Sequence, residues 1–124
     1  MMLPVLATMH SCDKIGGQED GPVADAGTYI LNNGNWGDND ANIGIYKPSS
    51  KTYAASAFYA ANNQKLGDLG QDVLVSDNKV YIAMNGSQTI WVTDPSLKIK
   101  EQVNASVEGS RLSPRYMAAA DGKV

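Results

Sequence analysis

The sequence predicts an all-β fold built from repeated hairpins, on the basis of three observations. Short apolar runs alternate with turn residues, and helical periodicity is hard to find over the 124 residues. Residues 79–95 give the strongest hairpin signal, because two runs of β-branched and aromatic residues flank the turn formers at residues 85–88 and Pro95 ends the second run. The third observation is that the chain contains this hairpin twice.

The two copies of the hairpin align over both of their strands. Residues 28–34 match residues 80–86, and residues 43–48 match residues 90–95. The first copy therefore has the same two strands but a longer loop between them.

A shorter segment, residues 76–80, recurs at residues 120–124. Copies spaced by about 44 to 52 residues, with several short strands in each, are typical of β-propeller blades. We therefore expect four-stranded blades at about residues 27–69 and 70–112, and an incomplete third blade at 113–124. Because a propeller ring closes with about four to eight blades, we interpret the chain as an N-terminal fragment. The alternative is a sandwich that contains two unrelated hairpins.

The second hairpin resembles the tyrosine-valine-threonine-asparagine repeat of YncE-like propellers. Residues 80–85 are similar to that family's V-Y-V-T-N strand, and residues 89–94 are similar to the T-V-S-V-I-D strand that follows it. Ala83-Met84 departs from the usual valine-threonine, and the approach to Pro114 is longer than usual. The family's later turn positions are matched at Gly109, Pro114 and Asp121-Gly122. The resemblance implies a seven-bladed ring in the complete protein.

The first residues of the chain predict a processing signal. Residues 1–11 are apolar and lead directly into the only cysteine, Cys12, in a pattern that resembles a bacterial lipobox. No Lys or Arg precedes Lys14, so we expect a truncated lipoprotein signal peptide, with Cys12 as the lipidated first residue. Residues 12–26 are polar and Gly-rich and fit a flexible tether. The alternative for Cys12 is a buried core cysteine.

A lipidated Cys12 predicts a protein held at the outer membrane or cell surface. The residues that follow it contain no other cysteine and no histidine, which excludes Cys–His or Ser–His catalysis and His-ligated metals from this stretch. The net charge of −3 gives no basic footprint for nucleic acid. No apolar run has the length of a transmembrane helix.

The long loop of the first hairpin is the most individual segment. Asp38, Asp40 and Asn42 have the alternating spacing of a calcium loop, but the rest of the EF-hand pattern is missing, so the calcium signal is weak. Trp36 stands in this polar loop and either folds back over the edge of the blade or stacks on a ligand.

Three further residues are candidates for ligand contact. Asn33 and Asn85 occupy matching positions after the repeated strand. Arg115 takes the place of Gln71, just before an expected inner strand, where propellers of this type turn polar groups toward the channel. An arginine there could bind an anionic ligand, and the alternative is a salt bridge between blades.

The resemblance also implies a function. YncE-like lipoproteins with an Asn-Asn-Gly-x-Trp-Gly segment resemble surface proteins that capture a nutrient, such as a corrinoid or a glycan, for an outer-membrane transporter. The alternatives are an interaction propeller without a small ligand, or a propeller enzyme of the quinoprotein dehydrogenase or lyase type. The enzyme is less favoured, because only Arg115 and scattered carboxylates are available, and we predict no catalytic residue and no cofactor.

Overall fold

The computed structural model describes residues 27–124. The expected signal peptide (1–11), the lipidation site Cys12 and the tether (12–26) lie outside the described residues. Strands dominate the described part, and its sheets are antiparallel, which confirms the all-β prediction. None of its helices is long and apolar enough to cross a membrane.

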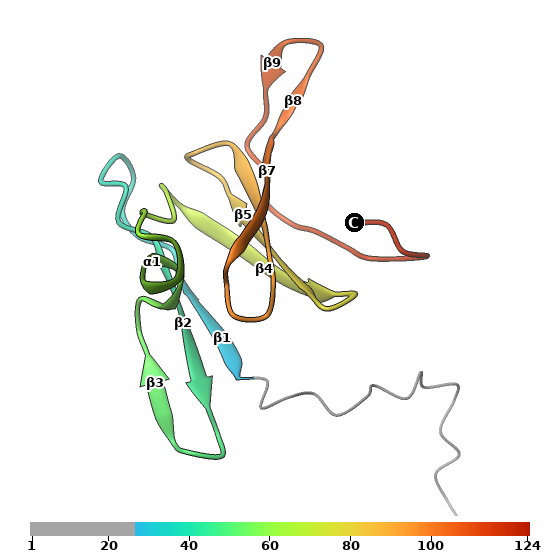
Figure 1. Cartoon of the computed structure of the whole chain (residues 1–124). Helices are drawn as coiled ribbons and strands as arrows, with labels where there is room; N and C mark the ends of the chain where they lie inside the picture. Colours follow the sequence, from blue (N-terminus) through green and yellow to red (C-terminus); the bar gives the residue numbers. More distant parts are fainter. Residues whose placement is uncertain (1–26) are drawn as a thin grey trace, which may run out of the picture.

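Two sheets form the body of the described chain, and a small hairpin projects from it (Figure 1). The first sheet has three strands, in the order β1 (Thr28–Asn32), β2 (Asn42–Lys47) and β3 (Thr52–Ala54). The second has four, in the order β4 (Gly70–Ser76), β5 (Lys79–Met84), β6 (Thr89–Thr93) and β7 (Ile99–Asn104). The projecting hairpin pairs β8 (Ser106–Val107) with β9 (Ser110–Arg111). No sheet within residues 27–124 closes on itself.

The two hairpins that the sequence repeats also share their strand register. Thr28 lies opposite Tyr46 in the first hairpin, and the aligned residues Val80 and Thr93 lie opposite each other in the second. The other four pairs of β1 and β2 correspond in the same way to pairs of β5 and β6. A slip of one residue would turn every side chain to the other face of the sheet. The sequence repeat is therefore a repeat of structure.

The shorter repeated segment, residues 76–80 and 120–124, forms a turn of the same kind in both places. Asp77 and Asn78, both with positive φ (48° and 58°), connect β4 to β5. Asp121 and Gly122 have φ values of 51° and 71°, and two backbone hydrogen bonds of 3.0 Å join the flanking Ala120 and Lys123. Positive φ at both central residues is the geometry that closes a two-residue hairpin. The chain thus repeats the β4–β5 turn near its end.

The core includes residues from both sheets and from a short helix, α1 (Ala57–Asn62), which was not expected because helical periodicity is hard to find in the sequence. Three alanines favour helix formation here, and Asn63 ends the helix in the left-handed conformation. The Phe58 ring is buried and lies 5.5 Å from the ring of Trp91 on β6. The helix therefore contributes Phe58 to the core that both sheets share.

One polar side chain of α1 ties the helix to the turn that leads into β7. Asn62 Nδ2 donates to the Leu97 carbonyl (2.8 Å) and to the Phe58 carbonyl (2.9 Å), and Asn62 Oδ1 accepts from the Ile99 N–H (3.0 Å). The Tyr29 hydroxyl adds a bond of 2.6 Å from β1 to the Pro95 carbonyl. These contacts fix the first sheet and the helix against the second sheet.

Candidate functional site

The ends of the repeated hairpins meet the chain that starts each following repeat. We call this region the loop edge; it comprises residues 33–41, 66–70, 85–88 and 114–115. The Gly70 N–H donates to the Asn33 carbonyl (3.0 Å), and the Asn85 N–H donates to the Leu69 carbonyl (2.8 Å). The Asn85 side chain donates to the Pro114 carbonyl (3.2 Å). The loop edge is therefore one connected surface.

Asp68 links the two hairpin loops within the loop edge. Its carboxylate oxygens accept from the Gly37 N–H at 3.1 and 3.2 Å, and its backbone N–H donates to Ser87 Oγ at 2.7 Å. A Cβ on Gly86 would come within 2.6 Å of the same carboxylate, so the second loop requires glycine there. Asp68 thereby holds the long first loop against the short second one.

Of the four predicted ligand residues, three are exposed and one is buried. Asn33 and Arg115 are exposed, and Arg115 makes no ion pair with any residue in the range 27–124. Asn85 is only 8% exposed, and its side chain is engaged by Pro114. Trp36 is 73% exposed, so its ring stands out from the loop rather than packing over the edge of the sheet. Asn33, Asn85 and Arg115 follow one another along the loop edge, and Trp36 lies in the same first loop.

Two of the three residues of the weak calcium candidate, Asp40 and Asn42, accept hydrogen bonds through their side-chain oxygens. Asp40 accepts from both the backbone N–H (2.7 Å) and the side-chain amide (2.9 Å) of Asn35, and Asn42 Oδ1 accepts from Asn32 (2.8 Å). The N–H of Asn35 holds the pKa of the Asp40 carboxyl below its ordinary value. Residues 27–124 contain no group of three His, Cys, Asp or Glu side chains placed to hold a metal. Calcium binding through Asp38, Asp40 and Asn42 stays a prediction.

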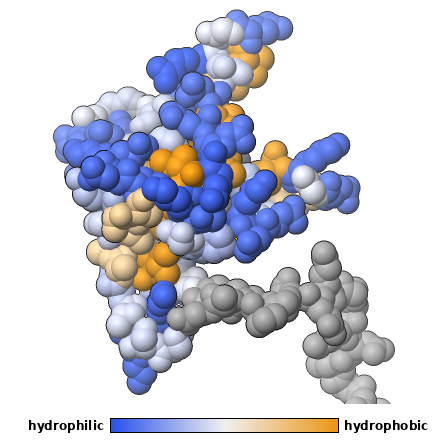
Figure 2. Space-filling view, in the orientation of Figure 1, coloured by the Kyte–Doolittle hydropathy of each residue, from blue (hydrophilic) through white to orange (hydrophobic). Residues whose placement is uncertain are grey.

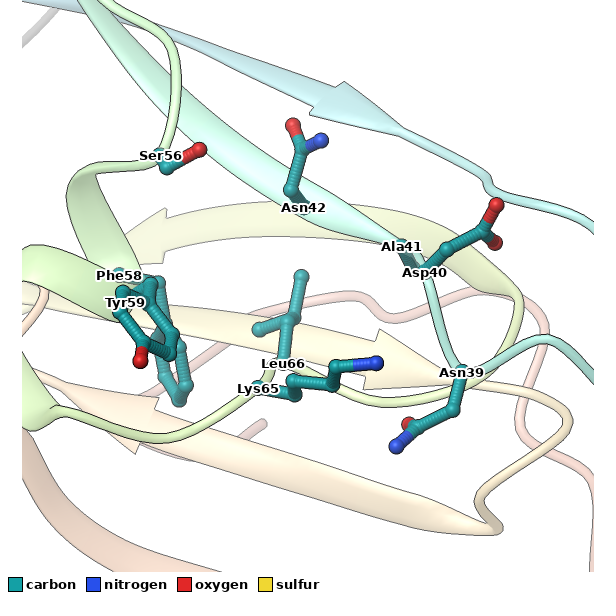
Figure 3. A pocket seen from close by; sticks show the side chains of 9 residues that line it. All are labelled: Asn39, Asp40, Ala41, Asn42, Ser56, Phe58, Tyr59, Lys65 and Leu66. Carbon is teal, nitrogen blue, oxygen red and sulfur yellow. The ribbon is translucent and has the colours of Figure 1, made fainter.

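A cavity of about 200 Å³ lies beside the loop edge, between the first loop and α1 (Figure 3). Phe58, Leu66 and Ala41 are buried and give it apolar surface. Its remaining lining is more polar and comprises Asn39, Asp40, Asn42, Ser56, Tyr59 and Lys65. Sequence analysis missed this pocket because its lining comes from three separate segments, one of them the unexpected helix.

The apolar part of the pocket is held in place from behind. The indole N–H of Trp91 donates to the Leu66 carbonyl (2.7 Å), and the Ala41 N–H donates to the Gly67 carbonyl (3.2 Å). Together with the Phe58–Trp91 ring contact, these bonds fix both walls relative to the second sheet. The pocket is therefore formed before any ligand enters.

No family model and no curated protein matches the sequence. The YncE-like resemblance stays a prediction.

Proposed function

We propose that this chain is part of a cell-surface lipoprotein whose β-propeller captures a nutrient, a corrinoid or a glycan, for an outer-membrane uptake system. The shared hairpin register supports the propeller. The junctions between repeats support it as well, because Asn33 contacts Gly70 and the aligned Asn85 contacts the aligned Pro114. Neighbouring blades of a propeller would be joined by such a recurring contact.

The observation that carries ligand capture is Trp36, 73% exposed on a loop whose backbone is restrained. Asp40 accepts from the residue before it and Asp68 from the residue after it, so both flanks of the tryptophan are fixed. A large aromatic side chain on a preorganised loop binds a partner at little entropic cost. Exposure of this ring to water is explained if a ligand covers it.

The test is equilibrium binding of a corrinoid and glycan panel to the protein and to Trp36→Ala. We expect at least an order of magnitude loss of affinity, about 1.4 kcal/mol or more, because aromatic anchors account for much of a binding energy. The melting temperature should hardly change, because the ring packs on little. Tyr53→Ala, which removes another exposed aromatic ring from β3, is the matched control. Equal binding by the Trp36 variant and the unmodified protein would refute this role.

One observation supports the contact with a transporter that the proposal includes. The projecting β8–β9 hairpin carries a hydrophobic patch (Figure 2), and Val107 and Leu112 are 57% and 47% exposed. Tyr116, 85% exposed, follows shortly after it. Exposed apolar side chains on a projecting element are suited to contact another protein, and the transporter is the partner that the proposal supplies. Truncating residues 106–111 to a two-residue turn should abolish transporter binding while leaving small-ligand affinity intact.

A further inference from the structure

We infer that Asn33 is a site of spontaneous deamidation and that the aligned Asn85 is protected from it, an inference that does not depend on the proposed ligand. The sequence contains two Asn-Gly pairs, at residues 33–34 and 85–86, each directly after the first strand of a repeated hairpin. Asparagine followed by glycine is prone to this reaction, because glycine has no Cβ to hinder attack by its nitrogen. The two pairs are chemically identical, so a difference between them reports on the fold.

The reaction needs only water and groups that the chain itself supplies. The Gly34 nitrogen attacks Cγ of the Asn33 side chain and loses its proton to solvent. The bond from Cγ to Nδ2 breaks, ammonia leaves, and a cyclic succinimide remains. Water then opens the ring: cleavage between the nitrogen and Cγ gives aspartate, and cleavage between the nitrogen and the backbone carbonyl carbon gives isoaspartate. The second product lengthens the main chain by one methylene group.

The first pair is accessible to this chemistry. Asn33 is exposed, and its side chain makes no hydrogen bond to any residue in the range 27–124. The Gly34 N–H likewise donates to no acceptor within this range. A Cβ on Gly34, whose φ is 78°, would lie 2.5 Å from Asp40 Oδ1 and 2.6 Å from the Ala41 nitrogen. The loop therefore requires glycine at this position, which keeps the reactive pair in place.

The second pair is held by the start of the third repeat. Asn85 is 8% exposed, and its Nδ2 donates to the Pro114 carbonyl at 3.2 Å. Its backbone N–H donates to the Leu69 carbonyl (2.8 Å), and its own carbonyl accepts from the Gln88 N–H (3.3 Å). Rotation of the amide toward the Gly86 nitrogen would break the bond to Pro114 in a site with little access to water. Reaction at Asn85 therefore requires local opening, which costs free energy.

Deamidation at Asn33 changes the loop edge in two ways. Either product places a new negative charge directly before the loop that carries Trp36. Isoaspartate also adds a methylene group to the main chain at the residue whose carbonyl accepts the Gly70 N–H (3.0 Å), where the first repeat joins the second. The modification therefore acts on the loop that the exposed tryptophan depends on.

The test incubates the protein at mildly alkaline pH, where the glycine nitrogen loses its proton more readily, and locates the conversion of amide to acid by peptide mapping with mass spectrometry. In native buffer, Asn33 should deamidate, and Asn85 should react at least about tenfold more slowly. In a parallel sample unfolded in urea, both should react at comparable rates. Asn33→Gln, which keeps the amide but enlarges the ring that attack must form, should show no conversion at position 33 and leave Asn85 unchanged.

Conversion confined to Asn33 in native buffer, and shared with Asn85 in urea, would establish the inference. Equal rates at Asn33 and Asn85 in the folded protein would overturn it, as would an unreactive Asn33 in the folded protein beside reaction in urea. If Asn85 stayed slow in urea, its protection would come from its sequence neighbours and not from the bond to Pro114, which would overturn the inference as well.

Discussion

Asn62 gives the sharpest test of how α1 is held to the second sheet. Asn62→Ala removes three hydrogen bonds, two of them to the Leu97 carbonyl and the Ile99 N–H, which lie in the turn before β7 and at its first residue. Each such bond contributes about 0.5–1.5 kcal/mol net, so we expect the free energy of unfolding to fall by about 2–4 kcal/mol. In a domain of this size that lowers the melting temperature by about 8–20 °C.

The assay is urea unfolding followed by circular dichroism and by the fluorescence of Trp91, which lies in the core and contacts Phe58 of the same helix. Asn104→Ala is the control, because Asn104 is exposed at the end of β7 and its side chain makes no hydrogen bond within the described chain. It should change stability by less than about 0.5 kcal/mol. Asn62→Asp keeps an acceptor for Ile99 and loses the amide donor, so it should lie between the two. An Asn62→Ala effect as small as that of the control would refute the role assigned to this side chain.

Two other predictions concern charge and anchoring. Burial alone would raise the pKa of Asp94, but hydrogen bonds from the Ser96 hydroxyl, the Lys98 N–H and Lys100 outweigh it and lower the pKa from 3.8 to about 2. Because the folded pKa is depressed, the stability from Asp94 is present above pH 4 and is lost as the pH falls toward 2. Asp94→Asn should flatten this part of a stability profile measured by acid titration, and an unchanged slope would contradict the prediction. For the anchor, Cys12→Ala in the complete precursor should move the protein from the membrane fraction to the soluble fraction; continued sedimentation with membranes would count against lipidation.

The hairpins could be predicted from sequence because their determinants are local. Alternating strand formers, the turn residues at 77–78 and 85–88, and the stop at Pro95 each act over a few neighbours, and all these features appear in the structure. The short helix could not be predicted in the same way, because six residues make fewer than two turns and give no readable period. Its place is set by burial of Phe58 against Trp91, a contact between distant parts of the chain.

In the candidate site, too, the local features could be predicted from the sequence and the contacts between distant segments could not. The unusual loop around Trp36 stands out in the sequence because a tryptophan among Asn, Asp and Gly is conspicuous, and its exposure matches the interpretation that it does not belong to the core. The pocket could not be inferred, since Tyr59 and Lys65 join Asp40 only after α1 has packed. Asn85 was expected to face a ligand, yet its side chain reaches Pro114, because the start of the third repeat passes that hairpin turn.

The two junctions between repeats place different demands on the chain. Gly70 brings its own N–H to the first junction, and the backbone carbonyl of residue 33 accepts it, so the side chain at that position is free to vary. Pro114 has no N–H, and the direction of the bond is reversed: its carbonyl accepts from an amide that only the side chain at position 85 supplies. The choice of residue at the end of one repeat therefore depends on the first residue of the next. Asn33 and Asn85 look equivalent in the sequence, but the side chain of Asn85 joins two repeats, whereas the side chain of Asn33 is available to contact a ligand.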